Sequence, residues 1–326
     1  MQPNQFGMSS YRNELELQAV IPGMYWLIYA FSGPVLWAIS THIDKYLVER
    51  YFKQGTVAVL MVFTAITGAL ALPFVWFFQP DVISLDYESV AVIAISGILY
   101  MSAIYFYLQA LQTEEASTIA PFFQAAGVFG LILGYFILGE QVSYSQLIGV
   151  LLIIAGSVIL SLRFGRGASQ VKKQLVILML FCALAMSLSS LIFKFFAVRD
   201  EFWTTTFWNF FGQTLFGVIL MLPAKNRKQF SEMVRANATA LLSVNVTNEL
   251  VNLGGNLGVR YTLLLAPLGV VQAISSTTSF FVLFFGVILS LFFPNFAREE
   301  ISIGSLTQKI IATTLVIAGV LLINMQ

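Results

Sequence analysis

Long apolar stretches alternate with short polar breaks along almost the whole chain. Each stretch is about 20 residues long, which is enough for one helix to cross ~30 Å of hydrocarbon. The pattern therefore predicts an all-α polytopic membrane protein with about ten transmembrane helices. The predicted helical cores are Tyr25–Tyr46, Val57–Phe78, Val90–Leu111, Thr118–Leu138, Leu147–Leu162, Leu175–Val198, Trp203–Leu222, Ala238–Tyr261, Pro267–Phe293 and Ile310–Met325.

The breaks between these cores carry turn-forming or charged residues, so we expect them to be loops. PDVISLDYES (80–89) follows the second core, LGEQVSYS (138–145) the fourth and PAKNRKQFSEMVR (223–235) the seventh. None of the breaks is long enough to form a separate soluble domain.

Composition supports a membrane protein and argues against several other classes. The 326 residues are 58% hydrophobic and only 10% charged, whereas about a quarter of a soluble domain is charged. The net charge of +1 gives no support for nucleic-acid binding. One cysteine and one histidine argue against a resident zinc site, and we expect no cofactor and no metal. The polar residues 1–24 contain no apolar region ending in a cleavage site, so we expect no signal peptide.

Four short similarities recur in the same order in both halves of the chain, which indicates an internal duplication. AISTHIDKYL (38–47) resembles SLSSLIFKFF (187–196), IAP (119–121) resembles LAP (265–267), LIIAG (152–156) resembles LVIAG (315–319), and Glu140 matches Glu299-Glu300. We therefore divide the chain into a polar segment 1–24, a first five-helix repeat 25–162, a basic linker 163–173 and a second repeat 174–326. Because five is odd, the second repeat enters the membrane from the opposite side, which makes the repeat inverted.

Lys and Arg in the loops predict the orientation, because cytoplasmic loops are enriched in both. Eleven of them fall on the side of the basic linker and three on the other side, where Arg12, Arg199 and Arg260 are assigned. The charge bias predicts a cytoplasmic linker and both termini outside. The expected location is the inner (cell) membrane of a bacterium.

The residues 110–160, ALQTEEASTIAPFFQAAGVFGLILGYFILGEQVSYSQLIGVLLIIAGSVIL, resemble the end of an EamA repeat of the drug/metabolite transporter superfamily. GVRYTLLLAPLGVV (258–271) and REEISIGSLTQKIIATTLVIAGVLL (298–322) resemble the second repeat more loosely. The resemblance implies an EamA-type transporter in which helices one to four and six to nine surround a central cavity. It places helices five and ten at the periphery. Many relatives have cytoplasmic termini, opposite to the charge bias, so the orientation stays open.

The stretch VNVTNELVNLGGNL (244–257) puts polar groups into a predicted spanning helix. At ~100° per residue its polar side chains fall within about a third of the circumference, so we expect them to face protein or water. Gly254-Gly255 lies beside this stripe, and paired glycines favour local unwinding. The stripe predicts a binding site for a polar solute, with helix–helix or oligomer contacts as the alternative. Its members are Asn245, Asn248, Glu249, Asn252 and Asn256.

Further polar positions on other predicted helices are candidates for the same cavity. They are Asn209 and Gln213 in helix seven, Gln272 and Ser276 in helix nine, Gln124 in helix four and Tyr100 in helix three. Packing contacts are the alternative for each of them.

Four charged or titratable residues are candidates for coupling or gating. Glu249 is expected to exchange a proton or bind a cationic group of the solute. Lys45 and Lys194 occupy matching repeat positions and would form a pair of gates, unless they only extend to the interface. His42 titrates near neutral pH, although a lone histidine is often a structural hydrogen-bonding residue. We expect Glu140 to cap or brace the turn in which it lies.

These features predict a secondary transporter that moves a small polar, zwitterionic or amine-bearing metabolite by alternating access. Its expected partners are the lipid bilayer, the solute, and a proton or counter-substrate, and a homodimer is left open. A lipid-linked sugar flippase is the alternative within the same fold. A membrane-embedded enzyme is disfavoured because the sequence lacks paired intramembrane acids or a metal cluster. No P-loop is present in the sequence, which argues against coupling to ATP.

Overall fold

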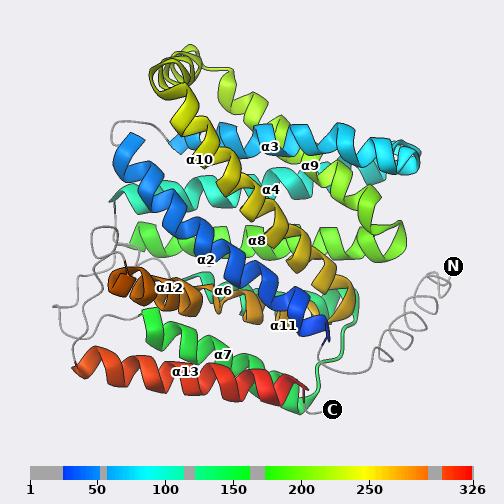
Figure 1. Cartoon of the computed structure of the whole chain (residues 1–326). Coiled ribbons are helices and arrows are strands. Elements are labelled where there is room, and N and C mark those ends of the chain that lie inside the picture. Colours follow the sequence, from blue (N-terminus) through cyan, green and yellow to red (C-terminus); the bar gives the residue numbers. More distant parts are fainter. Residues whose placement is uncertain (1–24, 52–56, 114–121, 162–172, 293–302, 325–326) are drawn as a thin grey trace, which may run out of the picture.

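A computed structural model describes residues 25–51, 57–113, 122–161, 173–292 and 303–324. These residues form a helical bundle (Figure 1) with short 3-10 and π segments at Pro80–Ile83 and Gly134–Leu138. The helices are α2 Tyr25–Tyr51, α3 Val57–Phe78, α4 Tyr87–Thr113, α6 Ala125–Leu133, α7 Tyr144–Ser161, α8 Lys173–Arg199, α9 Phe202–Met221, α10 Ala224–Leu265, α11 Leu268–Ser275, α12 Thr278–Phe292 and α13 Ile303–Asn324.

The described part of each predicted core is helical, apart from short breaks. The second core coincides with α3, Val57–Phe78. By length and composition, four spans among the described residues are apolar enough to cross a membrane. A fifth is counted if α9 and residues Ala224–Arg235, which meet at 100°, are one broken span. The chain is thus an integral, multi-pass membrane protein.

The segment 223–235, predicted as a loop, is mostly helical. α10 begins at Ala224 after Pro223 and continues to Leu265. The sequence contains no Gly or Pro between Ala224 and Arg235, so its charges do not prevent helix formation. The prediction of a loop here was wrong, because charge in a break is no obstacle to a helix outside the hydrocarbon.

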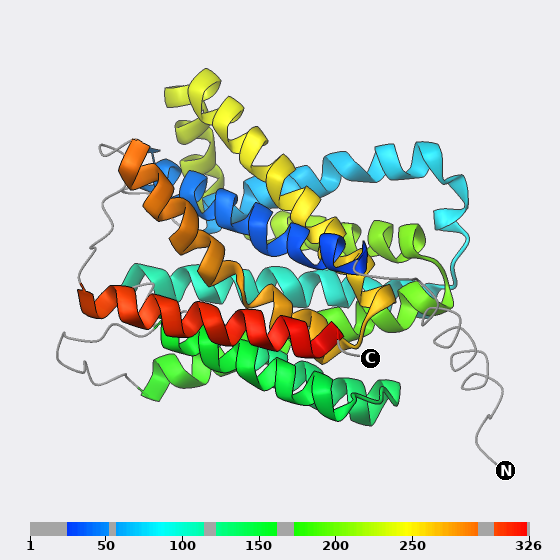
Figure 2. The same cartoon turned by 60° about the horizontal axis from the view of Figure 1, so that its bottom comes forward.

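The ninth predicted helix is broken into α11 and α12, which Figure 2 shows as two separate helical pieces. At the break the hydroxyls of Ser276 and Thr277 donate to the carbonyl oxygens of Ala273 and Ile274, at 2.6 and 2.7 Å. The Thr278 hydroxyl donates to Ser275 O at 2.7 Å. Such side-chain bonds compete with the helical backbone ladder and account for the break.

α2 and α10 lie side by side across the front of the bundle (Figure 1). Gly254 and Gly255 do not unwind α10, contrary to the prediction from their pairing. A Cβ on Gly255 would lie 3.0 Å from the indole nitrogen of Trp37 on α2, so the glycine permits close packing of the two helices. Small residues serve this purpose widely in membrane helices.

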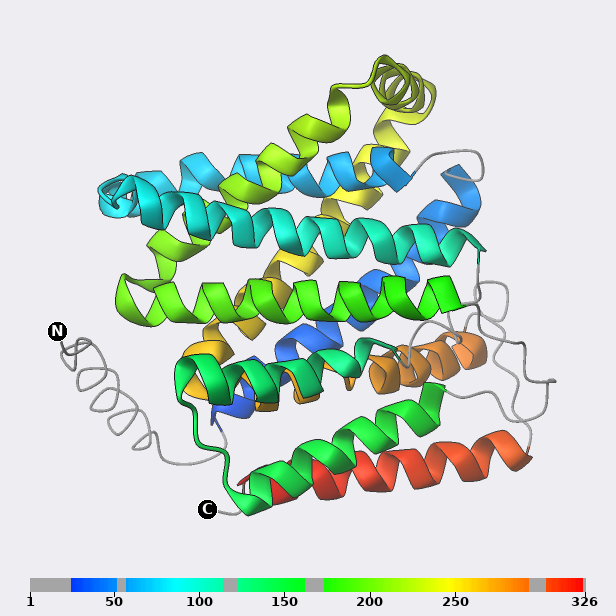
Figure 3. The ribbon, with the colours of Figure 1, turned by 180° about the vertical axis from the view of Figure 1, so that it is seen from behind.

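α4 and α8 pack against each other behind this pair, and α7 packs against α13 at one edge of the bundle (Figure 3). The peripheral position of α7 and α13 agrees with the family resemblance. α4 begins after Asp86, whose carboxylate accepts a hydrogen bond from the Ser89 N–H at 2.9 Å. This bond lowers the pKa of Asp86, which lies in the loop before the helix.

Candidate functional site

The polar stripe of α10 faces the interior of the bundle. Asn245, Asn248 and Glu249 are buried, whereas the neighbouring Val246 and Leu250 are more than half exposed. α10 thus directs polar groups inward and apolar groups outward, as expected where the surroundings are lipid. The burial of these three residues agrees with the predicted periodicity, whereas Asn252 and Asn256 are half-buried.

At the Asn245 end, the stripe contacts carboxylates and hydroxyls from α2 and α3. The Asn248 amide donates to Asp44 Oδ1 at 2.6 Å, and the Thr64 hydroxyl donates to Glu249 Oε1 at 2.9 Å. Among the described residues no Lys, Arg or His lies within ion-pair distance of Asp44 or Glu249. Two carboxylates from different helices therefore lie in one part of the bundle without a described cationic partner.

The middle of the stripe faces α4. The Tyr100 hydroxyl donates to Asn256 Oδ1 at 3.2 Å, and Tyr100 interacts electrostatically with both Glu249 and Arg260. Asn252 is half-buried, and the described residues provide no hydrogen-bond partner for its side chain. Tyr100 thus lies between the acidic and basic parts of the stripe.

Arg260 lies one turn beyond Asn256 on the same face of α10 and extends the stripe, and it is buried among residues of α8 and α9. Its Nη2 donates to Asn209 Oδ1 at 2.5 Å, and Gln213 Nε2 donates to the same oxygen at 2.8 Å. The Asn209 amide donates in turn to Ser96 Oγ at 2.6 Å. The predicted candidates Asn209 and Gln213 therefore meet the α10 stripe through Arg260.

Three buried polar atoms of the stripe have no protein partner within the described residues. They are the Oδ1 atoms of Asn245 and Asn248 and the Nη1 atom of Arg260. Buried polar groups are generally hydrogen-bonded, by protein, water or ligand. The stripe therefore offers acceptors beside the carboxylates and a donor at the guanidinium.

The remaining candidates, Gln272, Ser276 and Gln124, are not joined to this network by hydrogen bonds of the described residues. Gln272 donates to Ser190 Oγ on α8 at 2.8 Å, and the hydroxyls of Ser276 and Ser157 lie 3.3 Å apart. Gln124 is buried and its Oε1 has no described partner. Their contacts run between α11, α8 and α7 instead of toward α10.

Lys194 forms a buried ion pair with Glu140. Its Nζ lies 2.5 Å from Glu140 Oε1 and donates to Ala266 O at 2.7 Å. Glu140 Oε2 accepts the backbone N–H of Leu268 at 2.8 Å, at the start of α11. Glu140 thus braces its turn, as the sequence predicts, and also joins the π segment Gly134–Leu138 (η2), α8 and α11.

Of the other gating candidates, the structure describes the side chain of His42 but not that of Lys45. His42 Nε2 lies 3.0 Å from Val282 O on α12, which is a hydrogen bond between two helices. The side chain of Lys45 and residues Glu299 and Glu300 lie outside the described part of the chain. The proposed pair of lysine gates therefore remains a prediction.

Sequence reasoning misassigned Arg260 and did not select Thr64 as a site residue. It considered Asp44 only as part of an ion-pair gate or proton relay at the charged end HIDKYLVER (42–50) of the first helix. Arg260 was assigned to the outer loops, but it is only 7% exposed and lies within α10. The signal for its burial was present, because Arg260 falls on the same helical face as Glu249 and Asn256. Thr64 gave no such signal, because threonine is a common packing residue in membrane helices.

A pocket of about 330 Å³ lies on a different face of α10. Its apolar and aromatic wall comes from α2, α9 and α10 and contains Tyr29, Ser32, Phe202, Trp203, Gly254, Leu257, Gly258 and Tyr261. By helical angle these α10 residues lie about opposite the polar stripe. The pocket and the stripe are therefore separate features.

Comparison with solved structures shows a shared fold. One solved structure, described only as a crystal structure of a protein, matches with a TM-score of 0.62 at 16% identity. The match covers 91% of this chain and 95% of that chain, so the fold extends over both halves. No curated protein shows significant sequence similarity to the chain.

A family comparison bears on the first half of the chain. The model of the EamA-like transporter family matches residues 24–162. The quoted motif at 110–160 lies within this match, so the resemblance does not depend on composition alone. Residues 24–162 are thus similar to the EamA-like transporter family, which belongs to the drug/metabolite transporter superfamily.

Proposed function

We propose that the chain is a secondary transporter that binds a small polar metabolite along the α10 stripe and moves it by alternating access. The observation that carries this proposal is the buried stripe itself. It places a carboxylate, several amides and a guanidinium inside a membrane protein, with Asp44 of α2 beside them, and leaves polar atoms at both ends without partners among the described residues. Polar groups at membrane depth are costly and usually mark a solute or ion pathway.

The pattern of helix pairs supports two inverted repeats. In two repeats of the same fold, each helix of the first half has a counterpart in the second half. In chain order, α2 then corresponds to α8, α3 to α9, α4 to α10, α6 to α11 with α12, and α7 to α13. The observed pairs α3–α9, α6–α11 and α7–α13 then map onto themselves. The pair α2–α10 maps onto α8–α4, which is also observed. Two related halves that move against each other are the usual basis of alternating access.

The same exchange of the two halves also relates individual residues where α7 packs against α13. A Cβ on Gly149 would lie 2.6 Å from Gly319 O, and one on Gly156 would lie 2.8 Å from Ala312 O. The repeat alignment equates Gly156 with Gly319, and seven residues earlier it equates Gly149 with Ala312. One close contact is thus the repeat partner of the other, which supports a pseudo-twofold axis through this edge.

Glu249 is the proposed site of proton exchange or of contact with a cationic group of the solute. The Thr64 hydroxyl holds one of its oxygens, and Asp44 lies close enough to interact electrostatically. An ammonium group or a proton would offset this concentration of negative charge. The unpartnered Oδ1 atoms of Asn245 and Asn248 add acceptors for a donor-rich group in the same place.

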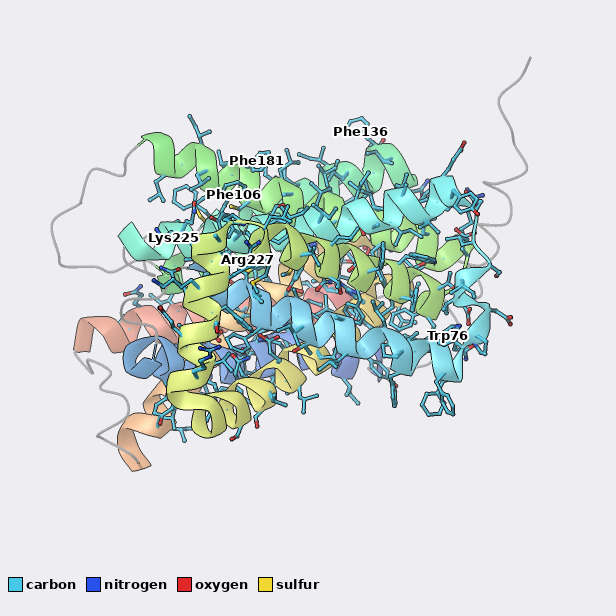
Figure 4. All side chains as sticks on the ribbon, turned by 90° about the horizontal axis from the view of Figure 1, so that it is seen from above. Trp76, Phe106, Phe136, Phe181, Lys225 and Arg227 are labelled. Atoms are coloured by element: carbon cyan, nitrogen blue, oxygen red, sulfur yellow. The ribbon has the colours of Figure 1, made fainter. Side chains whose placement is uncertain are left out.

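The proposed orientation places the linker end of the bundle in the cytoplasm. Lys225 and Arg227, near the start of α10, lie at the opposite end of the bundle from Trp76 (Figure 4). α2 begins and α13 ends at the end opposite these basic residues (Figure 1). Because Arg260 is buried, it no longer counts as an outer loop charge, and the bias of Lys and Arg toward the linker side increases.

The experiment that tests the proposed function is transport by the purified protein in liposomes, preceded by a thermal-shift screen. The screen covers amino acids, amines, sugar phosphates and nucleotide sugars. A solute at a hundred times its dissociation constant adds ~2.7 kcal/mol of stability, which is readily measured. Uptake of a stabilising solute that is lost on Glu249→Gln would support the proposal. If no solute stabilises the protein or crosses the membrane, the proposal is wrong.

The apolar pocket beside α2, α9 and α10 is the one observation that favours a lipid-linked sugar flippase. Tyr29, Trp203 and Tyr261 in its wall are each at least 39% exposed, so the pocket lies on the surface of the bundle. An acyl or isoprenoid chain would suit such a wall. Movement of a lipid-linked sugar between leaflets, with no uptake of free polar solutes, would favour the flippase.

A further inference from the structure

The guanidinium of Arg260 contacts two aromatic rings in the interior of the bundle. Its Cζ is 5.0 Å from the ring centroid of Phe193 on α8 and 5.0 Å from that of Phe210 on α9. The faces of the rings attract the charge of the guanidinium. The two rings therefore favour a cation at this position, although neither carries a negative charge.

Within the described residues, no carboxylate lies within ion-pair distance of Arg260. Its protein acceptor is the neutral amide oxygen of Asn209, and its Nη1 is buried without a partner. Arginine does not escape this cost by losing its proton, because its pKa in water is too high. A buried charge normally requires a partner, and the missing partner here is an anion.

Arg260 also lies at the other end of the stripe from Glu249 and its neighbour Asp44. Glu249 and Arg260 are 11 residues apart, so their backbone positions differ by ~16 Å along α10. The unpartnered atoms near the acids are acceptors, and the unpartnered atom at Arg260 is a donor. The two ends therefore suit chemically different groups.

We propose that Arg260 binds an anionic group of the transported solute, either a carboxylate or a phosphate. This inference rests on the proposed transport function and narrows its substrate class from polar metabolites to organic acids, phosphate esters or zwitterions. Arginine presents its donors in a planar fork that matches both anions. Asn209 is a positioning residue, because it holds Nη2 and leaves Nη1 free for the solute.

The test measures binding to the purified full-length protein by thermal shift and calorimetry. The probes are succinate, with succinamide as its neutral counterpart, and glycerol 3-phosphate, with glycerol as its neutral counterpart. Inorganic phosphate is included as a small anion. We expect acids of one class to bind wild type at least tenfold more tightly than their counterparts. The carboxylate and phosphate arms then identify which anion the site takes.

The matched variants are Arg260→Gln and Arg199→Gln. Arg199 lies at the end of α8 with a side chain 63% exposed, and its replacement makes the same change in net charge. Arg260→Gln should reduce the preference for acid over neutral counterpart to within about twofold, whereas Arg199→Gln should keep the wild-type preference. Arg260→Lys, which retains the charge without the fork, should bind acids with intermediate affinity and remains informative if Arg260→Gln fails to fold.

Three results would overturn the inference. They are equal binding of acids and their counterparts by wild type, wild-type acid binding by the Arg260 variants, and no binding of any acid probe. The failure of the proposed function is distinguishable from these. If a cationic or neutral solute is transported and depends on Glu249 but not on Arg260, the transporter stands and the anion site does not.

Discussion

Lys194 and Glu140 form an ion pair in which both side chains are at most 4% exposed. Each partner also binds the segment that precedes or begins α11, through Ala266 O and the Leu268 N–H. The pair thus ties η2, α8 and α11 together at one end of the bundle. This arrangement gives Lys194 a structural role that is separate from gating.

Replacing one partner of the pair should destabilise the protein. Lys194→Met leaves Glu140 buried without its cation, and removing one partner of a buried pair costs ~3–5 kcal/mol. The double variant Lys194→Met with Glu140→Gln should recover much of this loss, because no unpaired charge remains. Thermal unfolding of the two single variants and the double variant measures the coupling. A folded Lys194→Met protein with wild-type stability but impaired transport would instead support the predicted gate.

Glu249→Gln should preserve folding and abolish either proton-driven accumulation or binding of a cationic solute. The Gln side chain still accepts the Thr64 hydrogen bond but neither ionises nor exchanges a proton. Transport in liposomes with and without a pH gradient checks this expectation. Glu232→Gln on the same helix is the control, since Glu232 is 64% exposed. Full gradient-driven transport by Glu249→Gln with unchanged affinity would make the stripe a packing feature.

Two asparagines of the network should respond differently to replacement by alanine. Asn252 has no side-chain hydrogen bond within the described residues, so Asn252→Ala should leave stability nearly unchanged. It should weaken solute binding by ~1–3 kcal/mol, about 5- to 150-fold, if the solute bonds to it. Asn209 bonds to Arg260, Gln213 and Ser96, so Asn209→Ala should lower thermal stability as well. Calorimetric affinity and melting temperature, measured on the same samples, separate the two effects.

Site-directed labelling checks the orientation. Cys182 is buried and is the single cysteine of the sequence, so Cys182→Ala gives a cysteine-free background. A cysteine placed at Arg166 should label from the cytoplasm, and one placed at Gln5 should label from outside. Labelling of the linker cysteine from outside would reverse the orientation and leave the fold unaffected.

The sequence by itself determined where most of the helical cores lie and which face of α10 is polar. Apolar stretches of spanning length define the helices because lipid provides no hydrogen bonds to an open backbone. α3 coincides with its predicted range for this reason. The burial of Asn245, Asn248 and Glu249 followed from their spacing alone, because a helical period places them on one face.

Only the tertiary structure decided which groups meet. The pairings of Asp44 with Asn248, Thr64 with Glu249 and Lys194 with Glu140 join residues far apart in the chain. The burial of Arg260 depends on the rings of Phe193 and Phe210, which belong to other helices. Periodicity gives the direction of a side chain around its own axis, but the neighbour that it meets depends on the rotation and crossing of whole helices. Packing of glycines, aromatic rings and ion pairs sets that arrangement, and a one-dimensional pattern does not record it.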